Sequence, residues 1–192
     1  MDVIEVYQKV YKVLDEAGLV SGVHNFEEAI KKLYDNYDLN DQKDYEAMLA
    51  NNAYWHSLFI MDYCSSDRTA IFFVDSLYGS DEVNEFIHEL SGIMGQDWAV
   101  ENVRIVLPDD QTTIIELEDN LGGGKLEASV NKWDSSDVAF QLIKYLNANN
   151  TKGTLVTAGE EGQSVYYLPS DVAAKLSALD ILDKHSQPFA SM

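Results

Sequence analysis

The chain has 192 residues, of which 46% are hydrophobic, so it is long enough and apolar enough to fold around a core. It carries 33 acidic residues against 13 lysines and arginines, a formal net charge of −20, and this excess of acid argues against direct binding to nucleic acid or to anionic lipid. No apolar run approaches the ~20 residues that span a bilayer, the first residues lack the pattern of a secretory signal, and the single cysteine cannot form an internal disulfide.

These properties predict a cytoplasmic protein with one domain over 1–192. Within it we expect a helical segment at 1–52, an α+β core at 53–184 and a frayed tail at 185–192.

The N-terminal part of the sequence predicts helices. Apolar residues recur at helical spacing over 2–17, and Asn25 is placed to cap a second helix. A shorter third helix is expected to begin at Asn40. The segments 54–64 and 69–76 are rich in aromatic and β-branched residues and are separated by turn residues, so they predict a β-hairpin.

The second half of the sequence alternates helices with strands. A helix is expected after a cap at Ser80, a second after Ser135 or Ser136, and a third after Ser170, each with an acid at its positive end. The strands are expected in a meander and a final hairpin, at 98–107, 112–118, 125–133, 154–158 and 163–169. This order predicts an α+β fold with a mainly antiparallel sheet.

The run of glycines that ends at Gly124 and Lys125 does not match a phosphate-binding loop. Such a loop needs a glycine where this chain has Asp119 and a serine or threonine where it has Leu126, and it must open a helix. Here a strand is expected to follow. The run therefore predicts a flexible loop between two strands.

Residue spacing also argues against a catalytic cysteine and a calcium-binding loop. An extended strand would hold His56 ~26 Å from Cys64, so we interpret Cys64 as a core residue. A calcium loop aligned on Asp38 would place Lys43 at the sharp-turn glycine and Leu49 at the bidentate glutamate. We expect no catalytic residue, no metal and no cofactor.

Acidic residues concentrate between 62 and 119, where the only lysine or arginine residues are Arg68 and Arg104. On the helix after Ser80 the acids recur at spacings of four residues on the face opposite its apolar stripe, and no lysine is interspersed. Two aromatic residues stand just before helix caps, where they are candidate anchors for a partner. The predicted partner-binding residues are Tyr78, Asp81, Glu82, Glu85, Glu89, Asp109, Asp110, Glu118, Asp119 and Trp133.

In size, acidity, α+β character and lack of catalytic motifs, the chain resembles the bacterial immunity proteins, the antidotes to polymorphic or contact-dependent toxins. The resemblance is one of general character, so no family residues are carried over. It implies an inhibitor, not an enzyme, that binds a basic partner. The nuclease domain of a toxin is the expected partner, since its substrate-binding cleft must be positive and acidic side chains can occupy it.

Three other hypotheses remain open. The first alternative is a nucleic-acid mimic that blocks a DNA-binding protein, because the same charge argument applies to that partner. A second alternative is an enzyme with a site assembled from distant residues, for which the candidates are His56, Asp62, Cys64 and Asp75. A third is a structural domain in which the N-terminal helices form a homodimer surface.

Overall fold

The computed structural model describes residues 3–36, 57–58, 60–64, 69–73, 76–131, 134–158 and 162–179. In these ranges the helices are α1 (Val3–Glu16), α2 (Phe26–Asn36), α4 (Ile60–Cys64), α5 (Ser80–Met94), the 3₁₀ turn η3 (Gly95–Asp97), α6 (Ser136–Asn149) and α7 (Ser170–Ser177). The strands are β1 (Thr69–Phe73), β2 (Val100–Asp109), β3 (Thr112–Asp119), β4 (Gly124–Ser129), β5 (Gly153–Ala158) and β6 (Gly162–Pro169).

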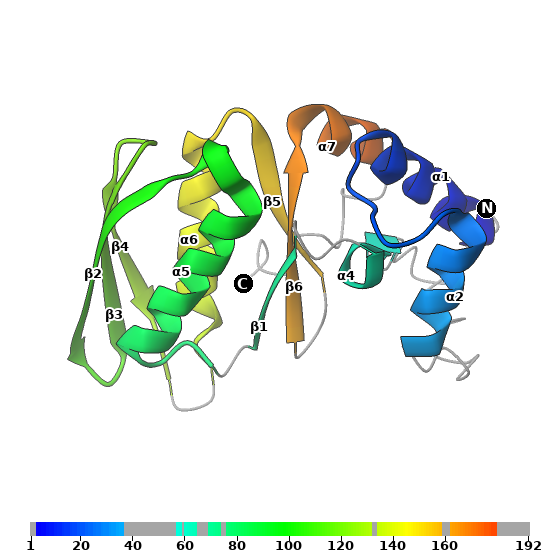
Figure 1. The fold of residues 1–192 in the computed structure, drawn as a ribbon. Coiled ribbons are helices and arrows are strands. Elements are labelled where there is room, and N and C mark those ends of the chain that lie inside the picture. Colours follow the sequence, from blue (N-terminus) through cyan, green and yellow to red (C-terminus); the bar gives the residue numbers. More distant parts are fainter. Residues whose placement is uncertain are drawn as a thin grey trace.

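The strands form two antiparallel sheets, which confirms the predicted α+β fold. The central sheet has the order β1-β6-β5, and the outer sheet has the order β2-β3-β4. In Figure 1 the elements lie in successive layers: the outer sheet, then α5 and α6, then the central sheet, then α1, α2, α4 and α7. The helices α5 and α6 therefore have a sheet on each side.

Strand β6 separates two hydrophobic cores because successive side chains of a strand point to opposite faces. Tyr166 and Leu168 join the core that is shared with α1, α2, α4 and α7. Val165 and Tyr167 join the core that is shared with α5, α6 and the outer sheet. Since β6 is the middle strand of the central sheet, it is buried on both faces, and all four of these side chains are buried.

The N-terminal helices pack on the central sheet, through the core to which Tyr166 and Leu168 belong. The two helices predicted over 2–17 and after Asn25 are both present. Asn25 caps α2 as expected, since its Oδ1 accepts a hydrogen bond from the backbone N–H of Glu28 at 3.0 Å. The Glu28 carboxylate in turn accepts one from the N–H of His24 at 2.8 Å. The helix expected from Asn40 lies outside the described residues.

The hairpin predicted from 54–64 and 69–76 is wrong in its first half. Ile60–Cys64 is helix α4, and β1 pairs with β6, about ninety residues further along the chain, instead of with its sequence neighbour. Met61 and Cys64 are three residues apart and Ile60 and Cys64 four apart, and all three side chains are buried. That spacing gives a helical turn one buried side, which strand composition alone did not indicate.

The predicted meander and the final hairpin are confirmed. Strand β3 pairs with β2 on one side and with β4 on the other, and β5 pairs with β6. The helices predicted at 80 and 136 are also present, as α5 and α6.

The predicted serine caps are wrong for α5 and α7, whereas Ser135 does occupy the N-cap position of α6 but makes no capping hydrogen bond. The residues at the N-cap positions of α5, α6 and α7 are Gly79, Ser135 and Pro169, and none of these three residues makes a side-chain capping hydrogen bond. Ser80 and Ser170 are each the first helical residue, which is too far into the helix for a capping hydroxyl. The Ser135 hydroxyl instead accepts a hydrogen bond from the backbone N–H of Leu77 at 2.8 Å, and so ties the start of α6 to the segment before α5.

Candidate functional site

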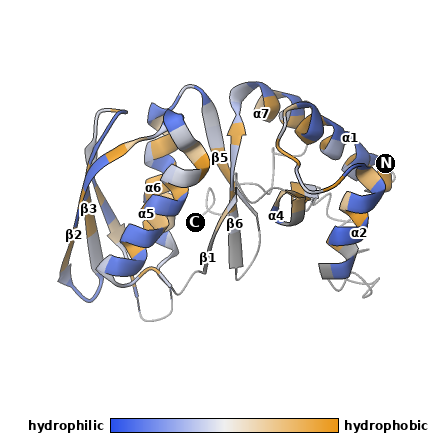
Figure 2. Ribbon diagram, viewed as in Figure 1, coloured by the Kyte–Doolittle hydropathy of each residue, from blue (hydrophilic) through white to orange (hydrophobic). Residues whose placement is uncertain are grey.

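Helix α5 places its acids because its other side is buried. The predicted apolar stripe is confirmed: Val83, Phe86, Ile87 and Leu90 are all buried in the core between the two sheets. The face opposite this stripe is left to solvent, and Figure 2 shows α5 as mixed in hydropathy along its length. Sequence periodicity therefore predicted both faces of this helix correctly.

The four acids predicted on α5 are all exposed: Asp81, Glu82, Glu85 and Glu89. Among the described residues, none of them takes part in an ion pair. Partial burial raises the pKa of Glu89, and the nearby charge of Glu85 raises it further. The Glu82 carboxylate folds back over Gly79, so closely that a Cβ on Gly79 would clash with Glu82 Oε2.

Asp109 and Asp110 lie at the same end of the molecule as the N-terminus of α5. The chain leaves α5 through η3 and enters β2 directly, so the helix and the strand run in opposite directions, and the end of β2 lies beside the start of α5 (Figure 1). Both side chains are exposed in the turn before β3. Asp109 Oδ1 accepts a hydrogen bond from the N–H of Gln111 at 2.9 Å, which helps to form this turn.

Glu118 and Asp119 lie at the opposite end of the outer sheet. In the register of β2 and β3, Asp109 is opposite Thr112 and Val100 is opposite Asp119. A strand advances ~3.3 Å per residue, so Asp110 and Glu118 are separated by roughly 20 Å or more. The pair Asp109 and Asp110 and the pair Glu118 and Asp119 therefore lie at opposite ends of the outer sheet.

Asp119 is a structural residue. Its carboxylate accepts hydrogen bonds from Trp98 Nε1 at 2.8 Å, from the N–H groups of Leu121 and Gly123 at 2.8 and 2.9 Å, and from the Tyr145 hydroxyl at 2.9 Å. Burial alone would raise the pKa of Asp119, but these hydrogen bonds outweigh it and lower the pKa. Burial and the Asp119 carboxylate raise the pKa of Tyr145.

The glycine loop joins strands β3 and β4 as expected, and these hydrogen bonds fasten it at its first residue, Asp119. Gly123 has a φ of 68°, and a Cβ there would lie 2.5 Å from the backbone oxygen of Leu117. In this conformation the N–H of Gly123 donates a hydrogen bond to Asp119 Oδ1. The glycines serve this turn, and nothing in its geometry is arranged for a phosphate.

The two predicted aromatic anchors have different outcomes. Tyr78 is only partly exposed and packs against the core between the sheets, so it does not stand out from the surface as an anchor. Trp133 lies outside the described residues. The aromatic residue that contacts one of the predicted acids is Trp98, which donates a hydrogen bond to Asp119. Trp98 is fully buried, and its sequence position alone did not single it out.

Two of the four residues considered for an enzyme are described. Asp62 on α4 is mostly buried, and its Oδ2 accepts hydrogen bonds from the hydroxyls of Tyr166 at 2.9 Å and Ser164 at 3.1 Å. Burial raises the pKa of Asp62 to about 6, against the opposing effect of these bonds. Burial also raises the pKa of the Cys64 thiol, which makes it a poorer nucleophile. His56 and Asp75 lie outside the described residues.

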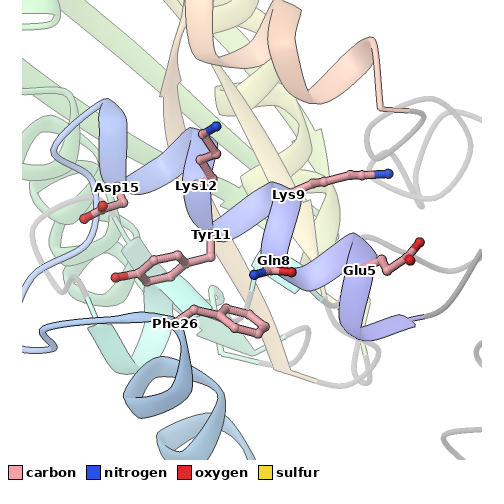
Figure 3. Close-up of a pocket in the computed structure, with 7 residues that line it drawn as sticks. All are labelled: Glu5, Gln8, Lys9, Tyr11, Lys12, Asp15 and Phe26. Carbon is pink, nitrogen blue, oxygen red and sulfur yellow. The ribbon is translucent and has the colours of Figure 1, made fainter.

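An open hollow of about 540 Å³ lies between α1 and α2 on the helical side of the molecule. Tyr11 and Phe26 pack edge to face in it, with ring centroids 5.7 Å apart (Figure 3). The charged side chains on its rim extend away from these rings and do not converge on one point. They are Glu5, Lys9, Lys12 and Asp15.

In the part of the chain that the structure describes, no group of three or more histidine, cysteine or acidic side chains is arranged to hold a metal ion. None of the described helices is both long and apolar enough to span a bilayer. Comparisons with models of protein families, with curated proteins and with solved structures gave no match.

Proposed function

We propose that this chain is an acidic inhibitor that binds and neutralises a basic protein, and that its partner is the nuclease domain of a toxin, as an immunity protein requires. The observation that carries the proposal is the exposed face of α5. Asp81, Glu85 and Glu89 recur there at spacings of four residues, and no cation among the described residues neutralises them.

The arrangement has a cost that binding would recover. Like charges four residues apart destabilise a helix by a few tenths of a kcal/mol per pair. The raised pKa of Glu89 has the charge of Glu85 among its causes, after partial burial. A positive surface laid against this face would relieve the repulsion and would be attracted over a long range by the net charge of −20. The cleft of a nuclease is such a surface, because it binds phosphates.

The experiment is capture of the partner from the native cell, with the tagged protein as bait and with mass spectrometry of the proteins that co-elute. The proposal predicts that a basic nuclease is retained at low salt and released at high salt, and that its activity is lost when the bait is added back. The matched bait carries Glu85→Lys and Glu89→Lys and should retain little of it.

Retention that responds neither to salt nor to the two charge reversals would contradict the proposal. Capture of a DNA-binding protein without nuclease activity would instead support the nucleic-acid mimic.

A further inference from the structure

Strand β2 has an open edge. It is the first strand in the order β2-β3-β4, and among the described strands it pairs only with β3. It is also the longest described strand, with ten residues. Figure 1 shows it at the margin of the molecule, with no other strand or helix on its outer side. Its register with β3 is regular from Asn102 to Val106, between two register shifts, and this part of the edge is a template on which another strand can pair.

The direction of the free backbone groups follows from the hydrogen bonds around β3. The N–H of Val130 bonds to the carbonyl oxygen of Gln111 at 2.9 Å, so the odd-numbered residues of β3 bond toward β4. The even-numbered residues of β3 then bond toward β2, where Arg104 is opposite Glu116 and Val106 is opposite Ile114. The backbone groups of the alternate residues, Val103 and Ile105, therefore point away from the sheet.

Side chains from α6 occupy the edges of two other strands. At β5, the amide of Asn147 donates to the carbonyl oxygen of Leu155 at 2.9 Å and accepts from its N–H at 2.7 Å. At β4, Asp137 Oδ2 accepts from the outward N–H of Ser129 at 2.7 Å. Such contacts block further pairing. Among the described residues, nothing equivalent bonds to Val103 or Ile105.

The charges beside this edge select the occupant. Helix α5 packs on β2 while α6 packs on β4, so the acidic face of α5 lies on the same side of the molecule as the open edge. The basic side chain of the strand, Arg104, is already paired with Glu116 at 3.3 Å. A second copy of this chain brings another −20 charges and is repelled, whereas an extended basic segment is attracted.

We infer that the β2 edge is a docking site for an extended, lysine- or arginine-rich segment of a partner protein, which adds a fourth strand to the outer sheet beside the acids of α5. Main-chain hydrogen bonds from Val103 and Ile105 provide the pairing, and the acids provide the preference for basic side chains. The inference rests on the proposed function, since it specifies how the basic partner would be held.

The test uses the intact protein and a synthetic octapeptide of alternating lysine and threonine at low salt. Amide hydrogen exchange is measured residue by residue. The peptide is expected to slow the exchange of Val103 and Ile105 by about tenfold near saturation, while Arg104 and Val106, already bonded to β3, change little. The matched control is the same peptide methylated on every internal backbone nitrogen, which keeps its charges but cannot donate to a strand.

The outcomes separate the edge from the charge. Protection of Val103 and Ile105 by the unmethylated peptide alone supports the inference. If the two peptides bind equally, change amide exchange only on α5 and do not slow exchange on β2, the docking site at the β2 edge is overturned. The electrostatic proposal is then unaffected. If neither peptide binds, the docking site at the β2 edge is also overturned, and the capture experiment then tests the proposed function independently.

Discussion

The carboxylate of Asp119 accepts a hydrogen bond from the indole Nε1 of Trp98 at 2.8 Å. Trp98 is fully buried between the sheets, so this bond fixes the start of the glycine loop to the core. An acid that the sequence placed on a binding surface is thus a support for the outer sheet. Removing the Asp119 carboxylate should therefore lower the stability of the fold.

Asp119→Ala is expected to lower the free energy of unfolding by about 3 kcal/mol, because it leaves the Trp98 N–H buried without an acceptor and frees the loop. Urea denaturation measures the change. The neighbouring Glu118→Ala is the control and should cost less than about 0.5 kcal/mol, since the Glu118 side chain is exposed and, among the described residues, accepts only a long hydrogen bond of 3.4 Å from Asn102. Equal effects of the two substitutions would contradict the structural role of Asp119.

Gly123→Ala should also destabilise the protein, by about 2 kcal/mol. Its φ of 68° is unfavourable for alanine, and the added Cβ would meet the backbone oxygen of Leu117. Gly92→Ala is the opposite case: Gly92 lies inside α5, and an added Cβ there would meet nothing within 4 Å. This second substitution should raise stability by up to about 1 kcal/mol, since alanine favours helix. If thermal unfolding showed that Gly123→Ala does not destabilise the protein, the conformation of the loop would be wrong, whereas a destabilising Gly92→Ala would contradict the open space beside Gly92.

Asp62 predicts a specific dependence of stability on pH. The pKa of Asp62 in the folded protein, about 6, lies above its ordinary value of 3.8, so the folded state binds the proton more tightly. The contribution of Asp62 to the free energy of unfolding is fully present below about pH 4 and is lost as the pH rises through 6. Asp62→Asn cannot ionise, and its stability relative to the wild type should therefore rise by roughly 2 kcal/mol between pH 4 and pH 7.

Chemical denaturation at a series of pH values measures this difference, with Asp110→Asn in the exposed turn as the matched control. Parallel curves for the wild type and Asp62→Asn would show that the carboxyl of Asp62 is not buried as described.

Local patterns were sufficient for much of the fold. The stripe of α5 and the strands of the meander are set by neighbours within a few residues, and periodicity identified them correctly. The pairing of β1 with β6 joins residues about ninety positions apart, and no local signal specifies it. The helix at Ile60–Cys64 was missed because its aromatic-rich composition is typical of strands, whereas its burial follows helical spacing.

The candidate site was predictable in part for the same reason. Exposure of Glu85 and Glu89 follows from the buried stripe on their own helix. The role of Asp119 depends on Trp98 and Tyr145, which approach it only in the folded chain. The open edge of β2 is visible only once Asn147 and Asp137 are seen to close the edges of β5 and β4.

The most direct test of the central claim is the rate of association with the captured basic partner, measured by stopped flow at low and high salt. Glu85→Lys with Glu89→Lys should slow association about tenfold or more at low salt, and the difference should shrink as salt is added. The control pair, Glu5→Lys with Glu27→Lys, makes the same change in net charge on exposed positions of α1 and α2, on the other side of the central sheet, and should slow it less than about threefold. Equal slowing by the two pairs, or a rate that neither salt nor either pair changes, would contradict binding through the acidic face of α5.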